Sequence, residues 1–236
     1  MKYLSIALLG ATLPVSALAQ QVQVTGGSLQ LKYSTFADET DLSRLNIEGS
    51  VEIGFSRAFS VQVDLGYNDF DLSDVDTSNI GLHGIYHVSE DLSLGAFYVR
   101  EDVEDIDFDL VGIEAGYETG KFAFEGYIAS FDIDNDGETV IGVAGRYGFD
   151  NGLGLGLRHE DAGSDSTASI ATTTITLDKD VTETVNLFLE VGSTDFDALG
   201  GSASETFVGV GGKIVFGAER GATFDQRGLF RLIPGF

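Results

Sequence analysis

The sequence predicts an all-β fold. The expected architecture is a transmembrane antiparallel up-and-down β-barrel of about 12 strands, within a range of about 10 to 14 strands. Three observations support this prediction. Apolar and polar residues alternate with a period of two, short turns alternate with longer acidic segments, and one face of the alternating runs is almost free of charge. No segment keeps the period of a helix, so we expect helices only as short connectors.

The N-terminus predicts a secretory signal peptide over residues 1–19. Met1 and Lys2 precede an apolar run from Tyr3 to Leu13, and Ala17-Leu18-Ala19 is a small-x-small cleavage site. The apolar run is too short to cross a bilayer, and Pro14 follows it. Since no later run is long enough for a transmembrane helix, a membrane location requires strands. We expect the barrel to occupy residues 20–216.

Strand-like alternation is clearest in the second and third segments. Leu45, Ile47 and Ile53 lie on one face of residues 44–55, opposite polar residues, and the pattern restarts at Phe59 after a short turn. Along the chain, the pattern predicts strands at 29–36, 44–55, 59–68, 79–88, 92–100, 110–118, 121–131, 139–147, 153–159, 168–178, 184–193 and 205–216. The segment 168–178 is the weakest of these, because its two faces are equally mixed.

The connections alternate in kind. Short turns are predicted at 56–58, 89–91, 119–120, 148–152 and 179–183. Longer acidic loops are predicted at 37–42, 69–78, 101–109, 132–138, 160–167 and 194–204. Short turns at one rim and long loops at the other are typical of outer-membrane barrels.

The apolar face predicts contact with lipid. Within the spans it carries no charged residue except Arg100 at a rim, and a charge at the bilayer midplane costs about 2–4 kcal/mol. Aromatic residues cluster at the turn end of the strands (Phe55, Phe59, Tyr86, Tyr117, Phe122, Tyr147, Phe216) and at the loop end (Phe36, Tyr67, Tyr98, Phe131), as expected of interfacial girdles. The alternative, a soluble sandwich or lipocalin-like barrel, would expose a glycine-rich surface with unprotected edges.

Composition excludes several functions. The formal net charge is −25, from 38 acidic and 13 basic residues, so a nucleic-acid binder with a basic footprint is excluded. The chain has no cysteine, which excludes disulfides, thiolate metal sites and cysteine nucleophiles. We expect no cofactor.

The signal peptide, the two-residue repeats, the acidic outer segments and a C-terminal Phe236 together resemble the porin-like superfamily of Gram-negative outer-membrane β-barrels. The resemblance implies an integral outer-membrane protein that contacts lipid and lipopolysaccharide, is assembled by the barrel-assembly machinery and passes small solutes. The chain departs from trimeric general porins because it is short and has no long loop that would enter the pore.

Charged residues on the inward face are the predicted pore lining. They are Lys32, Arg44, Arg146, Arg158 and Lys213 against Glu48, Glu52, Asp64, Glu114, Glu125 and Glu190. Either the basic and acidic residues form opposed walls of a pore, or they are paired with one another in ion pairs. The inward face is otherwise rich in Gly, Ser and Asn, with a few bulky residues such as Phe97, Tyr127 and Phe188, and this favours a narrow open pore over a packed plug.

The acidic loops predict a vestibule that concentrates cations. We assign to it Asp69, Asp71, Asp74, Asp76, Asp102, Glu104, Asp105 and Asp107. The predicted function is a porin-like channel for passive diffusion of small solutes, preferring cations. The alternative is a closed structural or interaction barrel whose acidic loops bind lipopolysaccharide, divalent cations or an external partner.

Two sequence motifs give only weak evidence of function. Asp132, Asp134 and Asp136 match the start of a calcium-binding EF-hand loop, but Val143 replaces its final glutamate, so only a weak cation site is predicted. His87-x-Ser89 is similar to a pair in the outer-membrane phospholipase, but no activating group follows and we expect no enzyme activity.

The role of the C-terminal residues 217–236 stays open at this stage. Either Phe236 is the barrel-assembly signal and the final strand lies later than predicted, or these residues form a periplasmic extension that docks to the barrel mouth or the cell wall.

Overall fold

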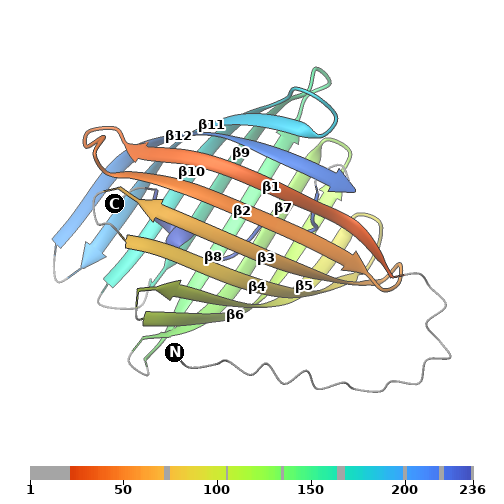
Figure 1. Ribbon diagram of the computed structural model, residues 1–236, viewed down its shortest axis with the longest axis horizontal. Coiled ribbons are helices and arrows are strands. Elements are labelled where there is room, and N and C mark those ends of the chain that lie inside the picture. Colours follow the sequence, from red (N-terminus) through yellow and green to blue (C-terminus); the bar gives the residue numbers. More distant parts are fainter. Residues whose placement is uncertain are drawn as a thin grey trace.

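The computed structural model describes residues 22–71, 75–104, 106–133, 136–163, 168–198, 201–217 and 221–234. They form one closed antiparallel barrel of twelve strands, which confirms the predicted fold class (Figure 1). The strands are β1 Gln23–Phe36, β2 Ser43–Gly54, β3 Phe59–Phe70, β4 Val75–His87, β5 Leu92–Val103, β6 Ile106–Thr119, β7 Phe122–Ile133, β8 Asp136–Gly148, β9 Leu153–Ala162, β10 Ala168–Asp180, β11 Val185–Ala198 and β12 Gly201–Gly217.

Each strand pairs with its neighbours in sequence, and β1 closes the barrel against β12. The closing register runs from Gly26 opposite Gly217 to Phe36 opposite Phe207. Closure matters because an open edge strand leaves backbone groups unpaired, which a bilayer does not tolerate. The weakest predicted segment is β10, which pairs fully with β9 and β11.

In the described part of the chain, no helix has the length and apolar character needed to cross a membrane.

The short turns and the loop at 37–42 were predicted at the correct places, but the other five acidic loops were predicted too long. The turns fall at 55–58, 88–91, 120–121, 149–152 and 181–184, and we call this end of the barrel the turn end. At the opposite loop end, β3 continues to Phe70 and β4 begins at Val75, while β5 continues to Val103 and β6 begins at Ile106.

There is a physical reason why acidic residues do not end these strands. A transmembrane strand needs about 9–11 residues, whereas the strands have 10 to 17. The extra length extends beyond the bilayer, where outward side chains meet water and a carboxylate does not disturb the backbone hydrogen bonds of the ladder.

The outer surface carries the apolar band. Exposed aromatics at the turn end include Phe55, Phe59, Tyr86, Tyr117, Phe122 and Phe216. At the loop end Tyr67 and Tyr98 are exposed, but Phe36 and Phe131 are only 4% and 6% exposed and face the interior, so their assignment to the outer girdle was wrong. They follow the inward parity of Ser34 and Ala129.

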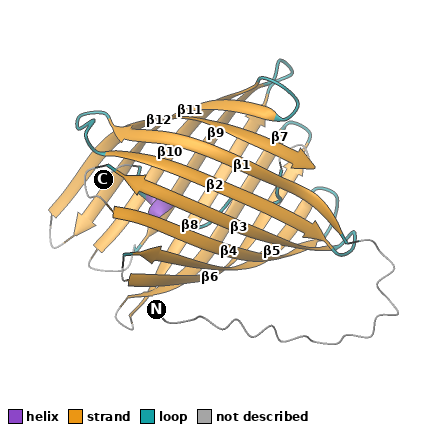
Figure 2. Cartoon of the chain, in the orientation of Figure 1, coloured by secondary structure: helices purple, strands orange, loops and turns teal. Residues whose placement is uncertain are grey.

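The C-terminal segment turns back into the barrel. Gly217 and Gly221 adopt φ of +79° and +90°, a region that glycine enters without strain. Residues 221–234, which we call the lumenal tail, then run inside the barrel and contain one short helix, η2 (Phe230–Leu232), visible within the ring of strands (Figure 2). Neither alternative considered for this segment anticipates that position, and Phe236 lies outside the described residues.

Candidate functional site

The inner wall of the barrel carries every charged residue predicted to line the pore. Strands β1 to β3 supply Lys32, Arg44, Glu48, Glu52 and Asp64; β6 to β9 supply Glu114, Glu125, Arg146 and Arg158; β11 and β12 supply Glu190 and Lys213. Several inward acids were missed, among them Glu101, Glu160 and Asp178. Glu101 and Glu160 were missed because their segments were assigned to loops, although the two-residue parity continues through both.

The first residues of the lumenal tail contact the inner wall near the turn end. The backbone N–H of Thr223 donates to Glu52 at 2.8 Å. Phe224 and Gln62 exchange two hydrogen bonds, since the Phe224 N–H donates to Gln62 Oε1 at 3.1 Å and Gln62 Nε2 donates to the Phe224 carbonyl at 2.8 Å. The Phe224 ring stacks near His83, with ring centroids 6.4 Å apart. Side chains of the wall thus bind the tail backbone as a complementary strand would.

Glycines make room for this contact. A Cβ on Gly95 would lie 2.8 Å from the Phe224 ring and 2.7 Å from Glu114 Oε1. The sequence suggested that the inward glycines leave free space, but at such positions the space is occupied by side chains. These glycines allow rings and the tail to lie directly on the wall.

Arg227 is the central polar contact of the tail. Its guanidinium donates to Glu114 at 2.8 and 3.0 Å and lies 2.7 Å from Glu125 Oε1. It also stands over the Tyr127 ring, 4.4 Å from the centroid. With its side chain fully buried, Arg227 has two carboxylates and an aromatic face in place of water.

Glu114 connects Arg227 to a second buried cluster. His83 Nδ1 lies 2.6 Å from Glu114 Oε1, and its Nε2 lies 2.9 Å from Asp64 Oδ2. The His83 ring is stacked on Phe97 at 5.5 Å. Acids and bases of the wall and the tail are therefore joined in one network.

The loop-end half of the tail is held by several strands. Arg44 donates to the Phe230 carbonyl at 2.5 Å, the Leu229 N–H donates to Glu101 at 2.5 Å, and Thr172 donates to the Leu232 carbonyl at 2.7 Å. Arg231 lies 3.4 Å from Glu48, and Ser34 donates to the Pro234 carbonyl.

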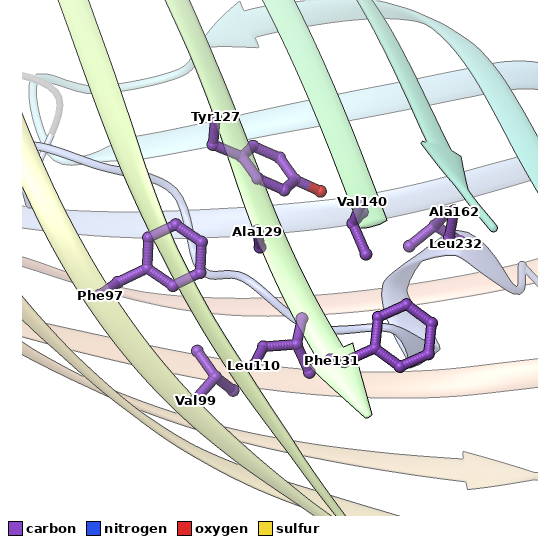
Figure 3. Packing of buried hydrophobic residues seen from close by; sticks show 9 residues of the cluster. All are labelled: Phe97, Val99, Leu110, Tyr127, Ala129, Phe131, Val140, Ala162 and Leu232. Atoms are coloured by element: carbon purple, nitrogen blue, oxygen red, sulfur yellow. The ribbon is translucent and has the colours of Figure 1, made fainter. Parts of the chain in front are cut away.

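Leu232 anchors the tail in the apolar core of the barrel. The cluster around it consists of Phe97, Val99, Leu110, Tyr127, Ala129, Phe131, Val140 and Ala162 (Figure 3). Burying an aliphatic side chain of this size contributes about 1.5–3 kcal/mol. The tail is thus held at the loop end by an apolar contact together with hydrogen bonds, and toward the turn end by polar contacts.

Charges on the opposite wall are paired but less buried. Lys32 lies 3.3 Å from Glu190 and Arg146 lies 2.6 Å from Asp178, while Arg158 contacts both Glu160 and Asp225 of the tail. The side chains of Arg146, Lys213 and Arg158 are 44%, 28% and 23% exposed. The tail therefore covers the wall from β2 to β7 more closely than the wall from β8 to β12.

Two cavities border the tail. One of about 740 Å³ opens at the turn end and is lined by Gln23, Thr25, Glu52, Ser60, His87 and Thr223, among others. A second, of about 40 Å³, is lined by Lys32, Arg44, Arg158, Glu190 and Arg231, among others. A large cavity at the turn end and a much smaller one beside the loop-end half of the tail therefore border this segment.

Comparison with known proteins places this barrel in a family. The family model described as "Gram-negative porin" matches residues 49–201, more than half of the chain. The chain belongs to the Gram-negative porin family. This porin is therefore an integral outer-membrane channel for small solutes, and the family match ends before most of β12 and the lumenal tail.

Solved structures agree on the fold. A KdgM porin is 12% identical with a TM-score of 0.61, and the alignment covers 80% of this chain and 99% of that chain. A NanC porin is 8% identical with a TM-score of 0.59, covering 80% and 98%. An outer-membrane channel from Pseudomonas putida F1 is 16% identical with a TM-score of 0.57, covering 86% and 99%. No curated protein matches the sequence.

The described acids of the predicted vestibule lie near the loop end of the porin, on strands and in short connections rather than on long loops. Asp69, Asp76, Asp102 and Asp107 occupy outward positions on strands, and Asp71 and Glu104 lie in exposed connections. Asp102, Asp107 and Asp109 surround Arg100 on the outer surface. Asp74 and Asp105 lie outside the described residues.

The structure brings no further reactive group to the His87-x-Ser89 pair among the described residues. His87 faces inward and contacts Ser60 at 3.0 Å and Ser93 at 2.9 Å, while Ser89 accepts hydrogen bonds within its own turn. Asp134 and the side chains of Asp132 and Asp136 lie outside the described part of the porin. Among the residues that are described, no group of three or more His, Cys, Asp or Glu is arranged to hold a metal ion.

Proposed function

We propose that this porin passes small cations and neutral solutes by passive diffusion in preference to anions. The observation that carries the proposal is an excess of acids on the inner wall. On the strands, five basic side chains face inward, and the acids that oppose them include Glu48, Glu52, Asp64, Glu101, Glu114, Glu125, Glu160, Asp178 and Glu190. The lumenal tail adds two bases, Arg227 and Arg231, and one acid, Asp225, so an excess of acids remains.

The acids outside the mouth support the same preference. A wall with low-dielectric surroundings and one dominant sign of charge raises the local concentration of counter-ions. Asp69, Asp76, Asp102 and Asp107 add negative charge at the loop end, where a solute from outside would enter if the turn end is periplasmic, as in other outer-membrane barrels.

A planar bilayer experiment tests the proposal. With purified porin in a KCl gradient, we expect discrete conductance steps. We also expect the reversal potential to have the same sign as the equilibrium potential of potassium. A reversal potential set by chloride would overturn it, and would favour acidic solutes such as the oligogalacturonate with which a KdgM porin was solved.

A second candidate function is a closed interaction barrel whose acidic rim binds lipopolysaccharide, divalent cations or an external partner. The observation that favours it is the lumenal tail, which occupies much of the space that a solute would cross. Liposome swelling separates the two functions. A channel lets small neutral solutes swell the liposomes at a rate that falls with solute size, whereas a closed barrel gives no swelling with any solute.

A further inference from the structure

The lumenal tail divides the inner wall into two parts of different charge. Between Thr223 and Leu229 it binds Glu52 on β2, Gln62 on β3, Glu101 on β5, Glu114 on β6 and Glu125 on β7. Most of the acid excess of the wall is therefore covered. The less buried remainder carries the bases Lys32, Arg146, Arg158 and Lys213, each within ion-pair distance of an acid.

The contact is specific along the length of the tail. Backbone N–H groups of Thr223, Phe224, Asp225 and Leu229 each meet an inward side-chain oxygen. Gln226 Nε2 donates to the carbonyls of Gly49 at 2.8 Å and Leu65 at 3.1 Å. Because buried polar groups need partners, this series of matched donors and acceptors indicates a wall built to receive this segment.

The position of the tail also controls the free cross-section. A barrel of this strand number lies between small barrels filled by side chains and large barrels with an aqueous channel. Here Arg227 of the tail and His83 of the wall are both buried, at 2% and 0% exposure, so no water-accessible space remains around them. By contrast, the side chains of Arg146 and Lys213 on the wall and of Asp225 in the tail are 44%, 28% and 38% exposed.

We propose that the lumenal tail is the constriction element of the channel and sets both its size limit and its charge preference. The inference rests on the proposed function. Porins that narrow the pore with an inserted loop would need a loop long enough to enter the lumen, and the connections between the described strands here are short. The tail occupies that position instead, and brings Arg227 and Arg231 against acids that would otherwise attract cations.

Truncation tests the proposal. A chain that ends after Gly217 keeps all twelve strands but loses the tail. We expect its single-channel conductance to rise by roughly twofold or more, because a barrel of this size is then no longer filled, and its reversal potential in a KCl gradient to move further toward potassium. Heat-dependent gel mobility shows whether the truncated barrel has folded.

A full-length variant decides the matter if the truncated chain does not fold. Arg227→Glu places a third carboxylate against Glu114 and Glu125, so the tail should leave its position, with conductance and cation preference both raised. Lys121→Glu is the matched control, since it makes the same change of charge in an exposed turn at the turn end, at a residue that does not line the turn-end cavity. It should leave the conductance unchanged.

The two proposals fail separately. If the full-length channel prefers chloride but either variant raises the conductance and shifts the preference toward potassium, the proposed cation preference falls and the constriction element stands. If a folded variant keeps the conductance and reversal potential of the full-length channel, the constriction element is overturned, whatever the sign of the preference. Silent bilayers with all variants overturn both.

Discussion

At the residue scale, the structure reverses the meaning of the inward glycines. In the sequence they suggested free space, since small side chains on a lumen face leave room for water. In the folded chain, Gly95 lies under the Phe224 ring and Gly112 lies under the Phe97 ring. What a glycine leaves empty on its own strand is filled by a side chain from elsewhere, so composition alone does not give the pore radius.

Gly95→Ala is a direct test of that packing. The added Cβ would lie 2.8 Å from the Phe224 ring, and overpacking of this kind costs about 1–3 kcal/mol. We expect hydrogen exchange at the Phe224 amide to speed up. Gly84→Ala is the control, because its Cβ meets only a backbone oxygen at 3.9 Å; equal exchange in both variants would contradict the packing.

Arg227 is the residue on which docking of the tail depends most. Removal of one partner from a buried ion pair costs about 3–5 kcal/mol, because the other charge is left uncompensated. In Arg227→Met the tail should therefore become accessible to protease while the barrel stays resistant. Arg57→Met, an exposed arginine in a turn, should show no change. A tail still protected in Arg227→Met would show that apolar anchoring by Leu232 is sufficient.

At the element scale, strand parity was the reliable guide and loop composition was not. The inward or outward side of each charged residue follows from the period of two, which pairing in the ladder enforces over the whole strand. The acidic segments were predicted to be loops, but acidic composition does not interrupt a hydrogen-bonded ladder. In β5 and β6 the same residues continue the ladder from Asp102 opposite Asp107 to Val103 opposite Ile106.

The entry turn of the tail offers an element-scale prediction. Gly221 has φ of +90°, and a side chain in the left-handed region costs about 1–2 kcal/mol. Gly221→Ala should weaken docking of the tail. The chain has no cysteine, so Ala222→Cys, at a site 8% exposed, reports docking by its labelling rate. The rate should rise in the double variant. An unchanged rate would show that this turn does not limit docking.

At the scale of the whole molecule, the net charge of −25 is distributed unevenly. The outer surface of the loop end and the wall of the lumen hold much of it, whereas the bases include Arg220, Arg227 and Arg231 in the C-terminal segment. A basic segment in so acidic a chain was the available signal that it binds acids of its own barrel. This signal did not show where the segment binds, because a basic segment can bind any acidic surface.

Salt dependence follows from this distribution. Charges at the mouth act over a Debye length that falls from about 10 Å at 0.1 M to about 3 Å at 1 M salt. We expect the cation preference, measured by reversal potentials at the two mean concentrations of KCl, to weaken at high salt. A preference that does not change with salt would locate its origin in the buried charges of the lumen rather than at the mouth.

The sequence by itself determined a strand number of about twelve, the face of most strand residues and the surface that meets lipid. All three follow from local alternation and from the cost of charge in a bilayer, which act within a strand. Only the tertiary structure decided that the C-terminal segment fills the barrel. Its contacts reach residues as distant as Ser34, 200 positions away, and they come from single side chains on many strands, a complementarity that exists only after the barrel has closed.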